Sequence, residues 1–259
     1  MALVAVCVYC TEENKKDDCL TVMMESLYKT VDFVGKHRLF ISVNGYTERT
    51  KETLAYHDVF PYPTVIWNEN NLGTAEAINL CWKHRNPGEH CLKMDEDIEV
   101  YQYGWLDDLE EIVNREPSIG QAALKRVDLQ ESPWNESPLY KSQLVMLPHQ
   151  PGQRWLMVEH VKHCLGSCVL HSSALLDKVG FLRQPLHYGL DDVLMSARSI
   201  LSGYNNVFLP NILIKHLDEG NTPYQQEKER VAGEAWEEYQ RWMKGYVDGT
   251  IPLYYNPFE

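Results

Sequence analysis

Apolar runs and amphipathic stretches alternate along the first hundred residues of the chain. Four short apolar runs have the length and continuity of strands buried on both faces of a sheet: Leu3–Tyr9, Arg38–Val43, Thr64–Trp67 and Cys91–Met94. Three intervening stretches show the spacing or composition of helices: Leu20–Val34, Glu48–His57 and Gly73–Arg85. Strands that alternate with helices at these intervals predict right-handed βαβ units and a mainly parallel sheet of the α/β class.

Polar residues follow each of the four predicted strands. These segments are Thr11–Asp18, Asn44–Gly45, Asn68–Gly73 and Asp95–Asp97. Because parallel strands end at the same edge of a sheet, and ligands bind beyond that edge, we expect the four segments to surround one binding site. The glycine-rich fingerprint of nicotinamide and flavin enzymes is absent after the first strand, which disfavours that class.

Composition and charge narrow the class further. The 259 residues carry a formal net charge of −13, which disfavours non-specific binding to nucleic acids and anionic membranes. The seven cysteines have no extracellular context to suggest a disulfide framework. No apolar run approaches the roughly 18 residues that a membrane span needs, and the first residues read as a strand rather than a signal peptide. We therefore expect a cytoplasmic protein without an integral membrane segment.

The acidic triplet after the fourth strand is the first candidate for chemistry. In an extended segment, Asp95 and Asp97 project from the same face because they are two residues apart. Two carboxylates in this arrangement suit a hard divalent cation such as Mn²⁺ or Mg²⁺. A solvated acidic turn is the alternative, and for an isolated DxD it would be the better one. The position directly after a buried strand in a βαβ array favours the metal site.

Three groups of segments, in order from about residue 3 to residue 217, resemble the GT-A glycosyltransferases, particularly inverting family 2. The first group, Asn71–Asn79, fits the pattern N-x-G-x-x-x-A-x-N at every fixed position. The second is Leu92–Asp97, which is similar to the DxD strand end of that family. The third consists of Gly166–Leu170, Leu175–Phe181, Tyr188–Asp192, Arg198 and Gly203–Tyr204. It is similar to the family's run from a core strand to an acidic pair at a helix start.

The resemblance implies a GT-A fold and a role for each matching residue. Asp97 is the expected metal ligand, Asp95 lies near the metal or the donor ribose, and His216 completes the metal site. Asp192 is the expected general base on an acceptor hydroxyl, with Asp191 beside it. Residues that the resemblance places at the donor are Thr11, Glu13, Asn44, Asn71, Gly73, Asn79, Asp95 and Glu96.

Two departures from the family pattern concern the nucleotide base. The second strand ends in Asn44-Gly45, where the family has an aspartate pair, and the loop after the first strand is a loose form of the family's sequence. A UDP-sugar remains the default donor because a DxD and a metal indicate a nucleoside diphosphate.

The two catalytic candidates with structural alternatives are the acidic pair and the histidine. Acidic residues favour helix N-termini for electrostatic reasons alone, and Asp191-Asp192 is expected to open a helix. A single histidine after a strand, such as His216, is often only a hydrogen-bonding group. His160 and His163 lie three residues apart but show no third ligand, so we expect them to be structural.

The domain prediction is a GT-A domain over residues 1–217, divided into a nucleotide-sugar half (1–100) and an acceptor half (101–217). Residues 218–259 are predicted as an extension with one helix from Pro223 to about Tyr246 and a tail that folds back on the body. Its aromatic stripe suits either the core or an interface with a second copy of the chain. The segment Gln130–His163 is expected to face the acceptor, where Trp134 or Trp155 either stacks on a sugar or a base or packs under a long loop.

The sequence predicts a metal-dependent inverting glycosyltransferase acting on a nucleotide-sugar donor and an acceptor hydroxyl. The acceptor is open: a glycan, a lipid-linked sugar, a protein, a small molecule or a modified nucleic-acid base. One alternative is a nucleotidyltransferase, although Tyr9–Asp18 lacks the glycines that wrap a triphosphate. Another is a non-catalytic nucleotide-sugar-binding protein, against which the four aspartates Asp95, Asp97, Asp191 and Asp192 argue.

Overall fold

The computed structural model describes residues 1–57, 62–131, 141–147, 154–218 and 223–259. Within them, ten strands form a sheet in the order β3-β2-β1-β4-β9-β6-β10-β8-β7, with β5 paired to β10. The strands are β1 (Ala2–Tyr9), β2 (Arg38–Gly45), β3 (Thr64–Trp67), β4 (His90–Asp95), β5 (Ile98–Glu99), β6 (Ile119–Arg126), β7 (Gln143–Met146), β8 (Met157–Val161), β9 (Cys168–His171) and β10 (Asn205–His216).

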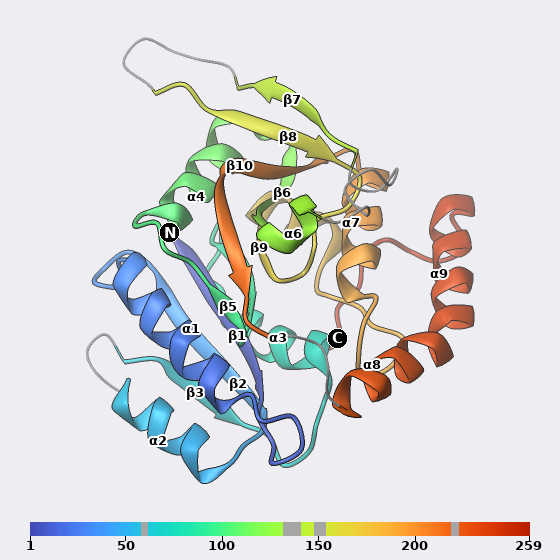
Figure 1. Cartoon of the computed structure of the whole chain (residues 1–259). Coiled ribbons are helices and arrows are strands. Elements are labelled where there is room, and N and C mark those ends of the chain that lie inside the picture. The colour runs from blue at the N-terminus through green and yellow to red at the C-terminus, as the bar shows by residue number, and fades with distance from the viewer. Residues whose placement is uncertain (58–61, 132–140, 148–153, 219–222) are drawn as a thin grey trace.

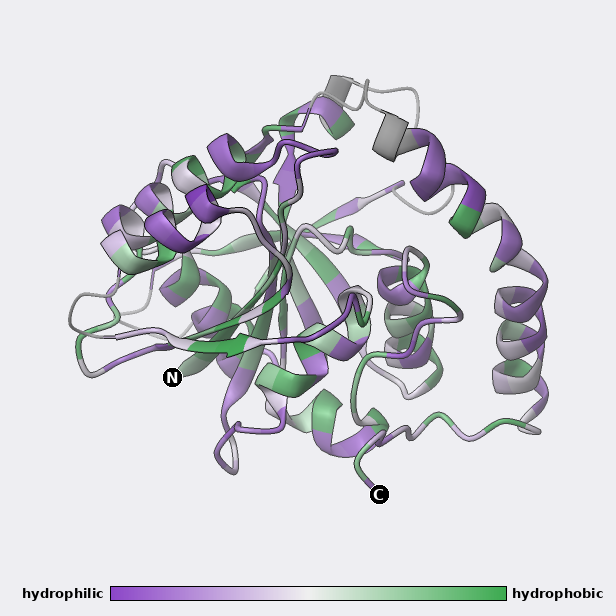
Figure 2. Ribbon diagram, turned by 90° about the horizontal axis from the view of Figure 1, so that it is seen from below, coloured by the Kyte–Doolittle hydropathy of each residue, from purple (hydrophilic) through white to green (hydrophobic). Residues whose placement is uncertain are grey.

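Helices cover both faces of this sheet (Figures 1 and 2). They are α1 (Asp17–Thr30), α2 (Glu48–Tyr56), α3 (Thr74–Trp82), α4 (Trp105–Arg115), α5 (Val127–Glu131), α6 (Ser173–Val179), α7 (Asp191–Leu201), α8 (Pro223–Glu234) and α9 (Trp236–Asp248). None of the helices in the described ranges has the length and apolar character needed to cross a membrane.

The alternation of side chains along β1 explains why both faces are buried. Ala2, Val4 and Val6 belong to a core cluster that includes residues of α1 and α4. Leu3 and Ala5 point the other way, into a cluster with residues of α3, α6 and α7. Because successive strand residues face opposite sides, an unbroken apolar strand requires a helix layer on each side.

The predicted parallel sheet is confirmed for the first half of the chain and modified in the second. β3, β2, β1 and β4 are mutually parallel, and β6 is parallel to β10. β9 is antiparallel to both of its neighbours, β4 and β6, so it joins the two parallel groups. The sheet is therefore mixed, and β9 brings the Gly166–Ser167 segment beside the end of β4, where the Asp95 backbone N–H donates to the Ser167 carbonyl at 3.0 Å.

The C-terminal region differs from the single predicted helix. The chain forms α8 and α9, which are separated by Ala235 and change direction there (Figure 1). The stripe of α9 packs within the chain, where Trp242 and Tyr246 contact Leu194 of α7. The tail folds back as predicted, because the Tyr255 backbone bonds with Val179 and Phe181.

A fully buried arginine anchors this tail. The Arg198 side chain is wholly inaccessible to solvent and donates to the backbone carbonyls of Leu253 (2.8 Å), Phe181 (2.7 Å) and Val179. A buried guanidinium requires such partners because an unpaired polar group in the interior is costly. Arg198 therefore ties α7 to the tail and to the segment after α6.

His171 gives the fold a specific sensitivity to acid. It is buried beside Gln121, and burial and the nearby Lys93 lower its pKa to about 3. In the unfolded chain the histidine has a pKa near 6.5, so on acidification it takes up a proton at a higher pH than in the folded protein. The free energy of unfolding is therefore unaffected by this group above pH 6.5 and falls as the pH is lowered below that value. Between pH 6.5 and 5.0 the loss is about 2 kcal/mol.

Urea unfolding of the wild type and of His171→Gln at pH 7.5 and 5.0 tests this expectation. The substitution should lower stability at both pH values, because it disturbs a packed site, and should shrink the difference between them by about 2 kcal/mol. An unchanged difference would assign the acid sensitivity to other groups.

Candidate active site

Two adjoining cavities lie at the carboxyl edge of the parallel strands. The larger, termed here the outer cavity, has a volume of about 600 Å³ and is lined by Cys7, Tyr9, Glu13, Asn44, Asn71, Thr74, His187, Tyr188, Gln226, Glu227, Lys228, Arg230 and Val231. The smaller, the acidic cavity, has a volume of about 270 Å³; beside backbone and neutral groups it is lined by Lys16, Lys93, Asp95, Glu96, Asp97, Arg126, Asp191, Asp192, His216 and Lys228. The predicted gathering of strand ends is thus present.

Hydrogen bonds between strand ends shape the wall of the outer cavity. The Asn44 amide donates to the Gly73 carbonyl at 3.0 Å and accepts from the Asn68 side chain at 2.9 Å. The Asn71 side chain accepts from the Gly73 backbone N–H at 3.0 Å. Asn44 and Asn71 therefore line the cavity as predicted and also hold the loop that opens α3.

Thr11 and Glu13 lie on the loop after β1. Glu13 lines the outer cavity, whereas Thr11 does not. The Thr11 backbone N–H donates to the Asn14 side chain at 2.9 Å, and Asn14 donates to the Tyr9 carbonyl at 2.6 Å. Asn14, which the sequence analysis did not single out, braces this loop.

Asn79 is a predicted donor-binding residue that the structure places elsewhere. Its side chain is buried, donates to the Leu182 carbonyl at 2.9 Å and accepts from the Leu182 N–H at 3.0 Å. Both ends of the amide are used, so Asn79 secures the segment after α6 to α3. This position of the motif therefore stabilises the fold around the site and does not line the cavity.

Gly73 is required by geometry. Its backbone, at φ 81° and ψ 170°, occupies a region that residues with a side chain rarely adopt, and an added Cβ would lie 2.6 Å from the His187 carbonyl oxygen. We expect Gly73→Ala to lower the free energy of unfolding by more than the about 1–3 kcal/mol of backbone strain alone, because the added methyl group must also shift His187. Gly35→Ala is the matched control, because Gly35 also has a positive φ of 76° but open space around it. Equal losses of unfolding free energy would show that the contact with His187 is unimportant.

One half of the acidic cavity centres on Asp97. Its Oδ2 lies 3.5 Å from His216 Nε2 and accepts a hydrogen bond from Lys16 Nζ at 2.6 Å. The same ammonium contacts Asp218 at 3.2 Å and Glu96 at 3.3 Å. Asp95 lines the cavity as well, 3.6 Å from Lys93 Nζ.

The carboxylates in this half lie close together and shift one another's pKa values. Burial raises the pKa of Glu96 to about 7, and Asp97 and Asp95 add to the shift against the opposing effect of Lys16. Burial would also raise the pKa of Asp97, but Lys16 and His216 outweigh it and hold that pKa below its ordinary value. Asp97 is therefore ionised at neutral pH, as a metal ligand must be.

The residues present fit a divalent cation. Asp97 Oδ1 is buried and has no hydrogen-bond partner among the described residues. Five carboxylates and four lysine or arginine side chains line the acidic cavity. Asp218, which contacts Lys16, is a sixth carboxylate close to it. Carboxylate oxygens with one imidazole nitrogen suit Mn²⁺, and an ion that also binds phosphates needs only one or two protein carboxylates.

The other half of the acidic cavity lies at the start of α7. Asp191 is buried and lies 3.0 Å from Lys93 Nζ, whereas the Asp192 side chain is 26% exposed in the cavity. Asp192 accepts from the Gly166 N–H at 2.9 Å and from the Val193 N–H at 2.7 Å. His163 Nε2 lies 3.6 Å from its Oδ2.

These surroundings shift the pKa values of the two aspartates in opposite directions. Burial raises the pKa of Asp191 despite its contact with Lys93. For Asp192, burial is outweighed by His163, Lys93 and the two backbone N–H groups, so its pKa lies below the ordinary value. Of the pair, Asp192 is the more accessible carboxylate and the one whose surroundings favour the ionised form.

Several polar residues of the site escaped the sequence analysis. The sequence analysis did not single out Lys16 and Lys93, which line the acidic cavity. His163, which was expected to be structural, lies 3.6 Å from Asp192. The sequence feature that could have indicated a role for Lys93 is its position inside the apolar run of β4. Lys228 of α8 lines both cavities, so residues beyond 217 also contribute to the site. Trp155 is 66% exposed and lines neither cavity, and Trp134 lies outside the described residues.

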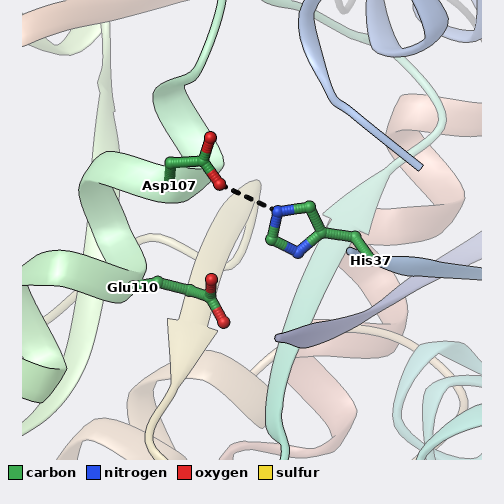
Figure 3. Close-up of side chains that lie close together, drawn as sticks. All are labelled: His37, Asp107 and Glu110. Atoms are coloured by element: carbon green, nitrogen blue, oxygen red, sulfur yellow. Dashed lines mark hydrogen bonds and ion pairs between the residues drawn. The ribbon is translucent and has the colours of Figure 1, made fainter. Parts of the chain in front are cut away.

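A second cluster with ligand-type side chains lies near the amino end of the sheet (Figure 3). His37, Asp107 and Glu110 place one ligand atom each within 4.8 Å of one another. His37 Nδ1 accepts from the Ala2 N–H at 3.3 Å, so Nε2 carries the proton and donates to Asp107 at 3.0 Å. Lys36 also pairs with Asp107 at 2.5 Å. This cluster is explained by hydrogen bonds that fasten α4 to the strand ends.

Comparison with known proteins identifies the fold. No known family profile and no curated protein sequence matches the chain. Solved structures do, among them the mannosyltransferase PcManGT from Pyrobaculum calidifontis in complex with GDP-Man and Mn²⁺, with a TM-score of 0.63 and 15% identity over 83% of this chain and 56% of that one.

Two further similar structures are S. aureus TarS 1–349 and GalNAc-T7 with UDP, GalNAc and Mn²⁺. TarS has a TM-score of 0.62 and 16% identity over 95% of this chain and 65% of its own. GalNAc-T7 has a TM-score of 0.62 and 14% identity over 94% of this chain and 50% of its own. The chain thus spans between half and two thirds of these proteins, and it has the GT-A fold that the sequence predicted.

Proposed function

We propose that this protein is a metal-dependent inverting glycosyltransferase that moves a sugar from a nucleotide-diphosphate sugar to an acceptor hydroxyl. The observation that carries the proposal is the adjacency of the two cavities. A cavity of about 600 Å³ opens beside a smaller one whose lining includes Asp97, His216 and a separate carboxylate, Asp192. A metal-dependent inverting transfer uses two groups: a cation at the leaving diphosphate and a base at the acceptor hydroxyl.

The outer cavity is the proposed donor site. Its volume lies in the range typical of small-molecule sites, and Glu13 and Asn71 offer polar groups to a base and ribose, while Asn44 holds the wall in place. Lys228 and Arg230 of α8 also line this cavity, where Lys228 pairs with Asp218 and Arg230 with Glu227 and Glu234. PcManGT and GalNAc-T7 were solved with Mn²⁺ and with GDP-Man or UDP, and a UDP-sugar is the default donor here.

Asp97 and His216, with Asp95 nearby, are the residues that would hold the cation. When bound, a divalent cation offsets the negative charge that develops on the leaving diphosphate. The excess of carboxylates around Asp97 supports this assignment.

Asp192 is the proposed base. The acceptor hydroxyl passes its proton to Asp192 while its oxygen forms a bond to the anomeric carbon, and the bond from that carbon to the diphosphate oxygen breaks. A single displacement of this kind inverts the anomeric configuration. The N–H groups of Gly166 and Val193 hold the carboxylate in place, and its partial exposure leaves it accessible to an acceptor. Asp191, tied to Lys93, is better suited to positioning than to proton transfer.

A thermal-shift screen tests the proposal. The protein is heated with UDP-, GDP-, ADP-, CDP- and TDP-sugars, each with Mn²⁺ and with EDTA. We expect one nucleotide class to stabilise the protein only when Mn²⁺ is present, and slow hydrolysis of that donor to follow. Stabilisation without turnover would favour a nucleotide-sugar-binding protein. No stabilisation by any sugar nucleotide, but stabilisation by a nucleoside triphosphate, would favour a nucleotidyltransferase.

A further inference from the structure

The buried ammonium of Lys16 is the feature of this site that the proposed chemistry does not use. The residue lies on the loop between β1 and α1, and only 7% of its side chain is exposed. Its Nζ lies among three carboxylates: 2.6 Å from Asp97, 3.2 Å from Asp218 and 3.3 Å from Glu96. A lysine so deeply buried and so fully paired acts as a fixed internal cation.

The loop backbone aims this ammonium at the acidic cavity. The Asn14 side chain accepts hydrogen bonds from the Thr11 N–H at 2.9 Å and from the Lys16 N–H at 3.3 Å. Asn14 also donates to the Tyr9 carbonyl at the end of β1. The loop is therefore fastened to the sheet directly beside the strand end that carries Asp97.

Lys16 contacts the Asp97 oxygen at which a cation shared with His216 would bind. Asp97 Oδ2 is the atom that faces His216 Nε2 at 3.5 Å, and it is also the acceptor of the Lys16 hydrogen bond. Two cations cannot share this oxygen without strong repulsion.

We propose that Lys16 is a resident counter-ion that holds the metal ligands in place and competes with the divalent cation for Asp97. The metal must displace the ammonium from Oδ2, so its affinity for the protein alone is weak. The donor diphosphate, which brings its own negative charge, makes the displacement favourable. Metal and donor consequently bind together. This inference rests on the proposed function only for the identity of the metal site.

The test is a Mn²⁺ titration followed by electron paramagnetic resonance, without donor or acceptor. Lys16→Met keeps the length of the side chain but removes its charge, and we expect Mn²⁺ to bind at least about ten-fold more tightly than to the wild type. Lys15→Met is the matched control, because Lys15 is the exposed neighbour and should leave the affinity unchanged. Lys16→Arg keeps the charge and should retain weak binding.

A measurement on the wild type covers the case in which Lys16→Met fails to fold. Acylation of Lys16 by an N-hydroxysuccinimide ester, followed by mass spectrometry, should rise when Mg²⁺ replaces EDTA, because the metal frees the amine from Asp97. Unchanged protection of Lys16 at a metal concentration that saturates the site would overturn the proposal.

The outcomes separate this inference from the proposed function. Equal Mn²⁺ affinity in the wild type and in folded Lys16→Met, with metal-dependent donor binding intact, would overturn the role of Lys16 alone. No Mn²⁺ binding to either protein, with or without UDP, would overturn both.

Discussion

Replacement of Asp97 by asparagine is expected to abolish metal-dependent binding of the donor. Asp97 is the carboxylate that faces His216, and its second oxygen is buried without a hydrogen-bond partner in the described structure. Asparagine keeps the shape but removes the charge, so Mn²⁺ loses its principal anionic ligand. We expect the Mn²⁺-dependent part of the UDP-sugar affinity to fall by at least about 100-fold, measured by calorimetry with Mn²⁺ and with EDTA.

Asp18→Asn is the matched control for this substitution. Asp18 lies near the same loop, its side chain is 76% exposed, and it lines neither cavity. Donor binding should be unchanged in this variant. Undiminished UDP-sugar affinity of Asp97→Asn in Mn²⁺ would remove Asp97 from the metal site and direct attention to Asp95 and Glu96.

Replacement of Asp192 by asparagine is expected to leave donor binding intact and to reduce transfer by at least about 100-fold, the lower range of general-base catalysis. The residue lies in the acidic cavity but not in the outer one, and its carboxylate is held by two N–H groups. The asparagine oxygen retains one of those hydrogen bonds. Its amide cannot accept the hydroxyl proton, so only the chemical step is affected.

Two measurements distinguish the roles of the aspartates. Donor affinity is read from the thermal shift, and transfer from the release of nucleoside diphosphate in the presence of acceptor. Asp191→Asn should disturb both, because Asp191 pairs with Lys93, which also contacts Asp95. Near-normal transfer by Asp192→Asn would move the base to another group, with Asp191 the next candidate.

The assembly of the site depends on one further contact that the motifs did not reveal. Gly166 approaches both halves of the acidic cavity: an added Cβ would lie 2.5 Å from Lys93 Nζ and 3.0 Å from the Asp192 Cβ. The glycine allows the loop before β9 to reach the end of β4. The antiparallel insertion of β9 between β4 and β6 therefore explains how the Gly166 loop, which binds Asp192, reaches the end of β4.

The sequence by itself determined the features that depend on local pattern. The apolar runs predicted β1 to β4, because a strand buried on both faces must be apolar throughout. Their order with the intervening helices predicted the parallel pairing, and hence the edge where Asn44, Asn71 and Asp97 meet. The acidic pair Asp191-Asp192 was placed at a helix start, where α7 does begin.

Only the tertiary structure decided the polar contacts between distant segments. Lys16 and Asp97 are 81 residues apart, and Asn79 and Leu182 are 103 apart, so no periodicity links them. The direction of β9 and the return of α8 to the cavities also depend on how whole elements pack. A lysine or asparagine has the same local propensities whether it faces solvent, a backbone or a carboxylate cluster. What it does is set by the partner that the fold brings to it, and that partner is specified elsewhere in the chain.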